Sequence, residues 1–126
     1  MNLTIDYCIK QLNRLNDFAI DVPQNNKVSE GINLVNECIR SGVQDRVQAL
    51  TELVNDAECV RNGEDAVFYC LEEVNTFIRV LSEFANDFGD DDFGKSVKHT
   101  VRGFISKLNL IKGQLDRIAA EEKFSN

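Results

Sequence analysis

Apolar residues recur along this chain at intervals of three and four positions, which predicts a series of amphipathic helices. Five stretches show this pattern: roughly residues 3–20, 28–39, 43–57, 67–88 and 93–118. Alternating β-branched runs bounded by turn dipeptides, which would indicate strands, do not occur. We therefore expect an all-α fold, an antiparallel up-and-down helical bundle of four to five helices.

The last two stretches carry the strongest apolar stripes, and we expect these two helices to pair. The apolar stripe of the first of them consists of Val67, Cys70, Leu71, Val74, Phe77, Ile78, Leu81, Phe84, Ala85 and Phe88. The stripe of the second consists of Phe93, Val97, Val101, Phe104, Leu108, Ile111, Leu115 and Ile118. Burial of these two stripes is expected to supply most of the stability of the bundle.

Helix-breaking residues separate the stretches. Pro23 removes a backbone donor and ends the first helix, and Asn25 or Asn26 can cap the second. Gly42 and Gly63 stand where the second and third helices are expected to stop. The last two helices are therefore predicted to be the longest.

The segment DFGDDDFG at residues 87–94 repeats Asp-Phe-Gly around two further aspartates. A calcium loop is excluded by spacing, because placing either glycine at the sixth position of such a loop puts Phe84 or Gly89 at the first ligand position. Gly89 instead suits a left-handed residue at a helix end, and the aspartates suit the first turn of the next helix. The segment is predicted to be a corner between two helices.

The composition describes an ordinary globular protein. The chain has 126 residues, of which 43% are hydrophobic and 28% charged, and we expect residues 1–126 to form a single helical domain. No stretch is long and apolar enough for a membrane span and the first residues do not resemble a signal peptide, so a cytoplasmic protein is expected. The four cysteines lie far apart, which argues against structural zinc and disulfides. Cys59 is the cysteine that we expect to be exposed. We do not expect it to be nucleophilic, because the acidic residues beside it disfavour the thiolate.

Charge is distributed unevenly along the chain. The net charge is −7, and residues 52–92 hold twelve acidic side chains against two basic ones, a net −10. Residues 93–126 hold seven basic and three acidic side chains, a net +4. We therefore expect some of the acidic side chains to be neutralised between the last two helices: Glu72, Glu73, Glu83 and Asp87 against Lys95, Lys98, Arg102 and Lys107. An acidic protein has no electrostatic attraction to nucleic acid and favours a partner with a basic surface.

The face of the 67–88 helix opposite its stripe mixes acids with an aromatic and an apolar side chain. This combination is typical of protein recognition, but it equally suits a solvated helix surface. The predicted partner-binding residues on and beside this face are Tyr69, Glu72, Glu73, Thr76, Val80, Glu83 and Asp87. Four large apolar side chains also lie off the stripes: Phe18, Leu34, Phe68 and Leu110. We expect some of them to pack against a fifth helix. Alternatively, they mediate self-association, and the protein is a homo-oligomeric structural subunit.

The only histidine, His99, lies opposite the stripe of its helix and opens the string His99-Thr100-Val101-Arg102-Gly103. This string resembles the His-x-Leu-Lys-Gly motif of histidine-containing phosphotransfer domains, which are helical bundles. The resemblance covers five residues, has Phe104 and Ile105 where the family has small residues, and leaves fewer residues after the histidine than the family has. It implies that His99 accepts a phosphoryl group, that Arg102 replaces the lysine, and that Gly103 leaves room for the surface of the response-regulator receiver to approach.

Other catalytic arrangements are not indicated. A single histidine excludes most hydrolase and di-iron sites, and the adjacent Glu72 and Glu73 point apart. We predict a non-enzymatic protein without metal or cofactor that binds another protein, as inhibitors, immunity proteins, antagonists and chaperones do. Phosphotransfer at His99 and self-association are the two alternatives.

Overall fold

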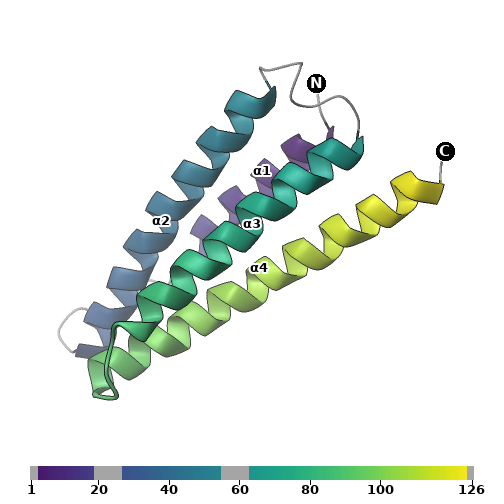
Figure 1. Ribbon diagram of the computed structural model, residues 1–126. Coiled ribbons are helices and arrows are strands. Elements are labelled where there is room, and N and C mark those ends of the chain that lie inside the picture. Colours follow the sequence, from purple (N-terminus) through teal and green to yellow (C-terminus); the bar gives the residue numbers. More distant parts are fainter. Residues whose placement is uncertain (1–2, 19–26, 55–62, 125–126) are drawn as a thin grey trace.

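Four α-helices and one short 3₁₀ turn make up the structure, a computed structural model that describes residues 3–18, 27–54 and 63–124 (Figure 1). The helices are α1 (Leu3–Arg14), α2 (Lys27–Val54), α3 (Gly63–Asn86) and α4 (Asp92–Phe124), and the 3₁₀ turn η1 (Leu15–Phe18) follows α1 directly. No strand occurs in these ranges. The predicted all-α class is confirmed.

Helices α3 (teal to green in Figure 1) and α4 (green to yellow) lie side by side and are joined by a tight connection. Helix α2 packs against α4 near the beginning of both helices, where a Cβ added to Gly31 would meet the Phe93 carbonyl oxygen at 2.9 Å and the Ser96 Cβ at 3.3 Å. Helix α1 contacts both α2 and α3 and is seen behind α3 in Figure 1. Each helix therefore buries one side against two or more others.

The core is a single cluster to which all four helices contribute. Its buried apolar members from α1, η1 and α2 are Ile5, Cys8, Leu12, Leu15, Val35, Ile39, Val43 and Leu50. Those from α3 and α4 are Ala66, Val67, Cys70, Val74, Phe77, Leu81, Ala85, Val97, Val101, Phe104, Leu108, Ile111 and Leu115. The remaining members of the two strongest predicted stripes are partly buried against this cluster, so both stripes face the core as predicted.

The predicted stop at Gly42 is wrong. Helix α2 runs without interruption through Gly42, and the predicted second and third helices are one helix. A Cβ at this position would overlap the ring of Phe77, which is buried on α3. The glycine is required by close approach of the two helices rather than by a helix end. Gly63, predicted to end a helix, is the first residue of α3.

The corner at residues 87–94 has the predicted position but not the predicted geometry at Gly89. Backbone bonds from Asp87 N to Phe84 O and from Phe88 N to Ala85 O, both 3.3 Å, tighten the end of α3, and Gly89 is not left-handed. Asp91 caps α4 as an aspartate was expected to do, because its Oδ1 accepts a hydrogen bond of 2.8 Å from the backbone N–H of Gly94.

An aromatic cluster closes the same corner. The rings of Phe84 and Phe88 meet edge to face with centroids 5.0 Å apart, and Phe88 lies 5.7 Å from Phe93. Since Phe84 belongs to α3 and Phe93 to α4, this cluster ties the end of one helix to the beginning of the next.

The predicted neutralisation of α3 acids by α4 bases is wrong. Glu73 pairs with Arg46 of α2, and Lys98 pairs with Asp90 of the corner at 3.4 Å. Neither Glu83 nor Asp87 forms an ion pair with a described residue. The reason is geometric: where α3 and α4 face each other their side chains are apolar, and their charges point outward.

Candidate functional site

The predicted partner-binding residues of α3 form an exposed strip with one half-buried edge. Glu72, Glu83 and Asp87 are exposed, and 47% of Val80 is open to solvent. Tyr69, Glu73 and Thr76 are half-buried. The strip is therefore a surface that another molecule can reach, and its half-buried edge turns toward α2.

Glu73 marks that edge. Its Oε2 lies 3.2 Å from Nε of Arg46, which reaches across from α2. Burial raises the pKa of Glu73; Arg46 opposes this shift, and the neighbouring Glu72 adds to it. Because the ion pair already occupies its carboxylate, Glu73 is a worse candidate for partner contact than Glu72 or Glu83.

A hollow of about 210 Å³ lies between α2 and α3 beside Val80. Its lining is mainly apolar and comes from Cys38, Ser41, Gly42, Asp45, Phe77, Val80, Leu81 and Phe84. Asp45 supplies a carboxylate at one side, and the exposed Glu83 follows Val80 by one helical turn. We call this hollow with Asp45, Val80 and Glu83 the α2–α3 groove.

Sequence reasoning identified Val80 and Glu83 but missed the α2 side of the groove. Asp45 was not considered because it lies outside the most acidic segment of the chain, residues 52–92. Gly42 was the available signal, since a glycine inside an apolar stripe allows a neighbouring ring to approach.

A second recess, of about 480 Å³, is polar and shallow. It is lined by Glu72, Glu73, Asn75, Thr76 and Arg79. Arg79 lies among the acids and moderates the negative charge of this part of α3. The negative charge is therefore best preserved further along, at Glu83 of α3 and at Asp87, which follows the helix directly.

His99 is exposed, as its position on the helix predicted. It borders a mainly apolar hollow of about 200 Å³ together with Phe18, Ile32, Thr100, Gly103, Phe104 and Lys107. Arg102 and Gly103 are also exposed, so the three residues singled out by the phosphotransfer resemblance lie on one accessible surface. Val101, at the leucine position of that motif, is buried, as its place in the apolar stripe predicted.

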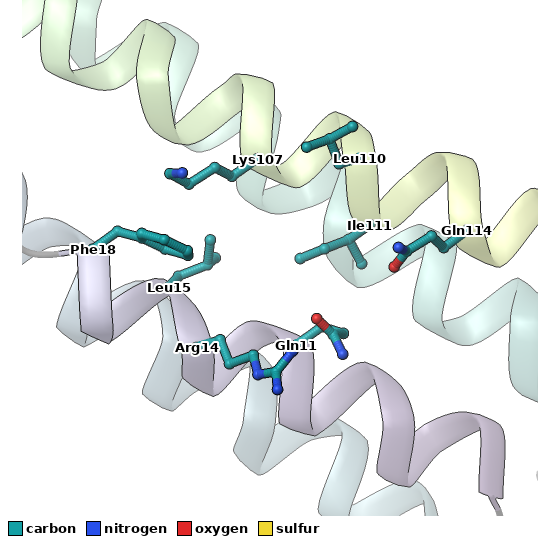
Figure 2. A pocket seen from close by; sticks show the side chains of 8 residues that line it. All are labelled: Gln11, Arg14, Leu15, Phe18, Lys107, Leu110, Ile111 and Gln114. Atoms are coloured by element: carbon teal, nitrogen blue, oxygen red, sulfur yellow. The ribbon is translucent and has the colours of Figure 1, made fainter.

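A further hollow of about 200 Å³ adjoins it between α1, η1 and α4, and the two share Phe18 and Lys107 (Figure 2). Figure 2 shows Leu15 and Phe18 facing Ile111 and Lys107 across this space. Nζ of Lys107 lies 3.6 Å from the ring centroid of Phe18, a cation–π contact. We call the two hollows together the α1–α4 groove.

Sequence reasoning placed Phe18, Phe68 and Leu110 off the apolar stripes and expected some of them to pack on a fifth helix. That expectation is wrong for these three, because Phe18 is 46%, Phe68 56% and Leu110 70% exposed. Leu34 is half-buried. The exposed three remain available to a second molecule.

The described cysteines do not form a reactive site. Cys8 and Cys70 are buried in the core, where a hydrogen bond with Cys8 and burial both raise the pKa of the Cys70 thiol. Cys38 is half-buried. Burial raises the pKa of its thiol, and the negative charge of the nearby Glu37 raises it further. All three are free thiols, and Cys59 lies outside the described residues. Raised thiol pKa values suppress the thiolate that nucleophilic chemistry needs.

Within the described ranges, no group of three or more histidine, cysteine, aspartate or glutamate side chains is arranged to hold a metal ion. Over the same residues, no helix has both the length and the apolar character needed to cross a bilayer. Comparison of the chain with protein-family models, with curated proteins and with solved structures found no match.

Proposed function

We propose that this protein acts by binding another protein, and that the partner docks on α3 and the α2–α3 groove. The observation that carries this proposal is the apolar hollow lined by Val80 and Asp45, with the exposed Glu83 one helical turn after Val80 on α3. An apolar hollow accepts an anchoring side chain, while the surrounding charge selects the partner. The partner is therefore one that presents an apolar anchor on a basic surface.

The partner must contact more of the surface than the hollow alone. A specific interface buries about 800 Å² on each partner. The exposed strip of α3 extends the groove in both directions, through Glu72 and Thr76 on one side and Asp87 on the other. This extent suits an inhibitor, immunity protein, antagonist or chaperone that acts without catalysis. A cytoplasmic location and an antiparallel up-and-down order of the helices belong to the same proposal.

The test is capture of the partner from a native lysate by the purified protein and by two double variants. Asp45→Lys with Glu83→Lys reverses the charge beside the hollow. Asp116→Lys with Glu121→Lys makes the same change of net charge at exposed positions of α4 and serves as the matched control. We expect the wild type and the control to retain one dominant partner and the groove variant to lose it. Equal capture by the groove variant would contradict the proposal.

Phosphotransfer is the second candidate function, and the shared exposure of His99, Arg102 and Gly103 favours it. In that reaction an imidazole nitrogen of His99 attacks the phosphorus of an acyl phosphate, the bond from phosphorus to the acyl oxygen breaks, and the carboxylate leaves. Arg102 would balance charge on the phosphoryl oxygens.

Incubation with acetyl phosphate tests it. An acid-labile adduct of one phosphoryl group is expected in the wild type and not in His99→Gln. If no adduct forms, or if it persists in His99→Gln, the phosphotransfer function is excluded.

A further inference from the structure

The exposed large apolar side chains of the described residues fall into two pairs with opposite charge around them. Phe68 and Val80 belong to α3, where Glu72 and Glu83 are exposed. Phe18 and Leu110 line the α1–α4 groove, which also contains Arg14 and Lys107. The molecule thus carries two surfaces of complementary charge, each with apolar side chains unburied.

The α1–α4 groove has room for an aromatic ring. An apolar cavity of about 150 Å³ can hold one benzene molecule, and each of the two hollows here has a volume of about 200 Å³. Leu15 and Ile111 form the buried floor of the hollow in Figure 2, and Arg14 and Lys107 stand at its sides. The groove therefore suits a ring that carries a carboxylate close to it.

The first half of α3 presents this combination. The ring of Phe68 is held edge to face against Tyr69, with centroids 5.5 Å apart. Glu72 follows Phe68 by four residues, which places the two side chains on the same side of the helix about 5–6 Å apart at Cβ. Both side chains are exposed, so ring and carboxylate are offered together to a second molecule.

We propose that the α1–α4 groove is filled by a second copy of this chain, with Phe68 and Glu72 of one copy entering the groove of the next. The ring of Phe68 contacts Phe18 and Leu110, and Glu72 pairs with Lys107 or Arg14. The two contacting surfaces are different, so each copy in a pair still has one surface open. Association is therefore heterologous, and longer assemblies form as concentration rises.

This proposal does not depend on the proposed function. Val80, in the α2–α3 groove, is twelve residues from Phe68, which corresponds to about 18 Å along the helix. The test needs the purified protein alone and no partner, so either proposal can fail while the other holds.

Light scattering coupled to size exclusion, run over a wide range of protein concentration, tests the proposal. We expect the average mass to rise with concentration and to fall as salt is added. Phe68→Ser removes the inserted ring and Leu110→Ser removes part of the groove, and each is expected to weaken association by about tenfold or more. Val80→Ser removes an exposed apolar side chain of similar exposure from the same helix and is expected to leave association unchanged.

A mixture of the Phe68→Ser and Leu110→Ser variants tests whether the contact joins these two different surfaces. Phe68→Ser retains an intact groove, and Leu110→Ser retains an intact Phe68, so an equimolar mixture should form pairs that cannot grow further. A wild type that stays monomeric at every concentration would overturn the proposal. So would a mixture in which the two variants do not pair, because the contact would then not join these two different surfaces.

Discussion

Gly42 shows how one residue can set the distance between two helices. Its missing side chain leaves the space that the buried ring of Phe77 occupies, and the same approach brings Val80 beside Asp45 in the α2–α3 groove. A glycine inside a helix costs about 1 kcal/mol relative to alanine. The packing of Phe77 must offset that cost.

Replacing Gly42 by alanine is therefore expected to destabilise the protein although alanine is the better helix former. Overpacking a core costs about 1–3 kcal/mol, which exceeds the gain in helix propensity. Gly113→Ala is the control, because a Cβ there meets no atom within 4 Å and the propensity gain stands alone. Urea denaturation should show a lower free energy of unfolding for Gly42→Ala and a higher one for Gly113→Ala. A higher free energy of unfolding in both variants would contradict the close approach of α2 and α3 at Gly42.

Glu73 is expected to make the stability of the protein depend on pH in a specific direction. Burial raises its pKa above the ordinary value of about 4.3, so the folded state binds its proton more tightly than the unfolded state does. The stability contributed by protonated Glu73 is fully present below that ordinary value and is lost as pH rises through the raised pKa.

Glu73→Gln should remove this part of the pH dependence and change the stability at neutral pH by no more than about 1 kcal/mol, because the pair with Arg46 is only partly buried. Glu83→Gln makes the same chemical change at an exposed position of α3 and is the control. Thermal unfolding followed between pH 4 and pH 7 checks the prediction. An unchanged slope in Glu73→Gln would show that another group titrates.

The beginning of α4 is defined by the capping residue Asp91. Asp91→Ala removes the acceptor for the N–H of Gly94 and should lower the free energy of unfolding by about 1 kcal/mol. Asp90→Ala, one residue earlier, removes only the exposed pair with Lys98, which contributes about 0–1 kcal/mol. Chemical denaturation of the two variants compares them, and an Asp90 variant that loses more than the Asp91 variant would contradict this assignment of the cap.

The helices also show what periodicity can and cannot predict. The stripes of α3 and α4 were predicted well because every third or fourth position is apolar through to the corner. The continuity of α2 was not, because a glycine that ends a helix and a glycine that admits a ring look alike in sequence. The partner of Glu73 was missed for a related reason: periodicity gives the buried side of a helix, not which neighbour lies at each edge.

The molecule has one core, so a defect in any helix should weaken all of it. Leu108 is buried on α4, and Leu108→Ala is expected to cost about 2–5 kcal/mol and to leave a single unfolding transition. Leu110→Ala, two residues away and 70% exposed, should change stability by no more than about 0.5 kcal/mol. Circular dichroism during heating compares them, and two separate transitions in either variant would show that the helices do not share one core.

The candidate surfaces depend on contacts between helices that are distant in sequence. The exposure of His99, Val80 and Glu83 followed from helical geometry alone and was predicted. The α2–α3 groove required Asp45 to lie beside Val80, and the α1–α4 groove required η1 to lie beside Lys107. Neither neighbour relation is encoded in the periodicity of a single helix.

Hydrogen–deuterium exchange of the protein with and without its captured partner would locate the binding surface. We predict slower exchange in residues 38–45 of α2 and 77–86 of α3, the two sides of the α2–α3 groove, while α4 is unaffected. Protection confined to α4 around His99, with no change at Val80, would contradict the account.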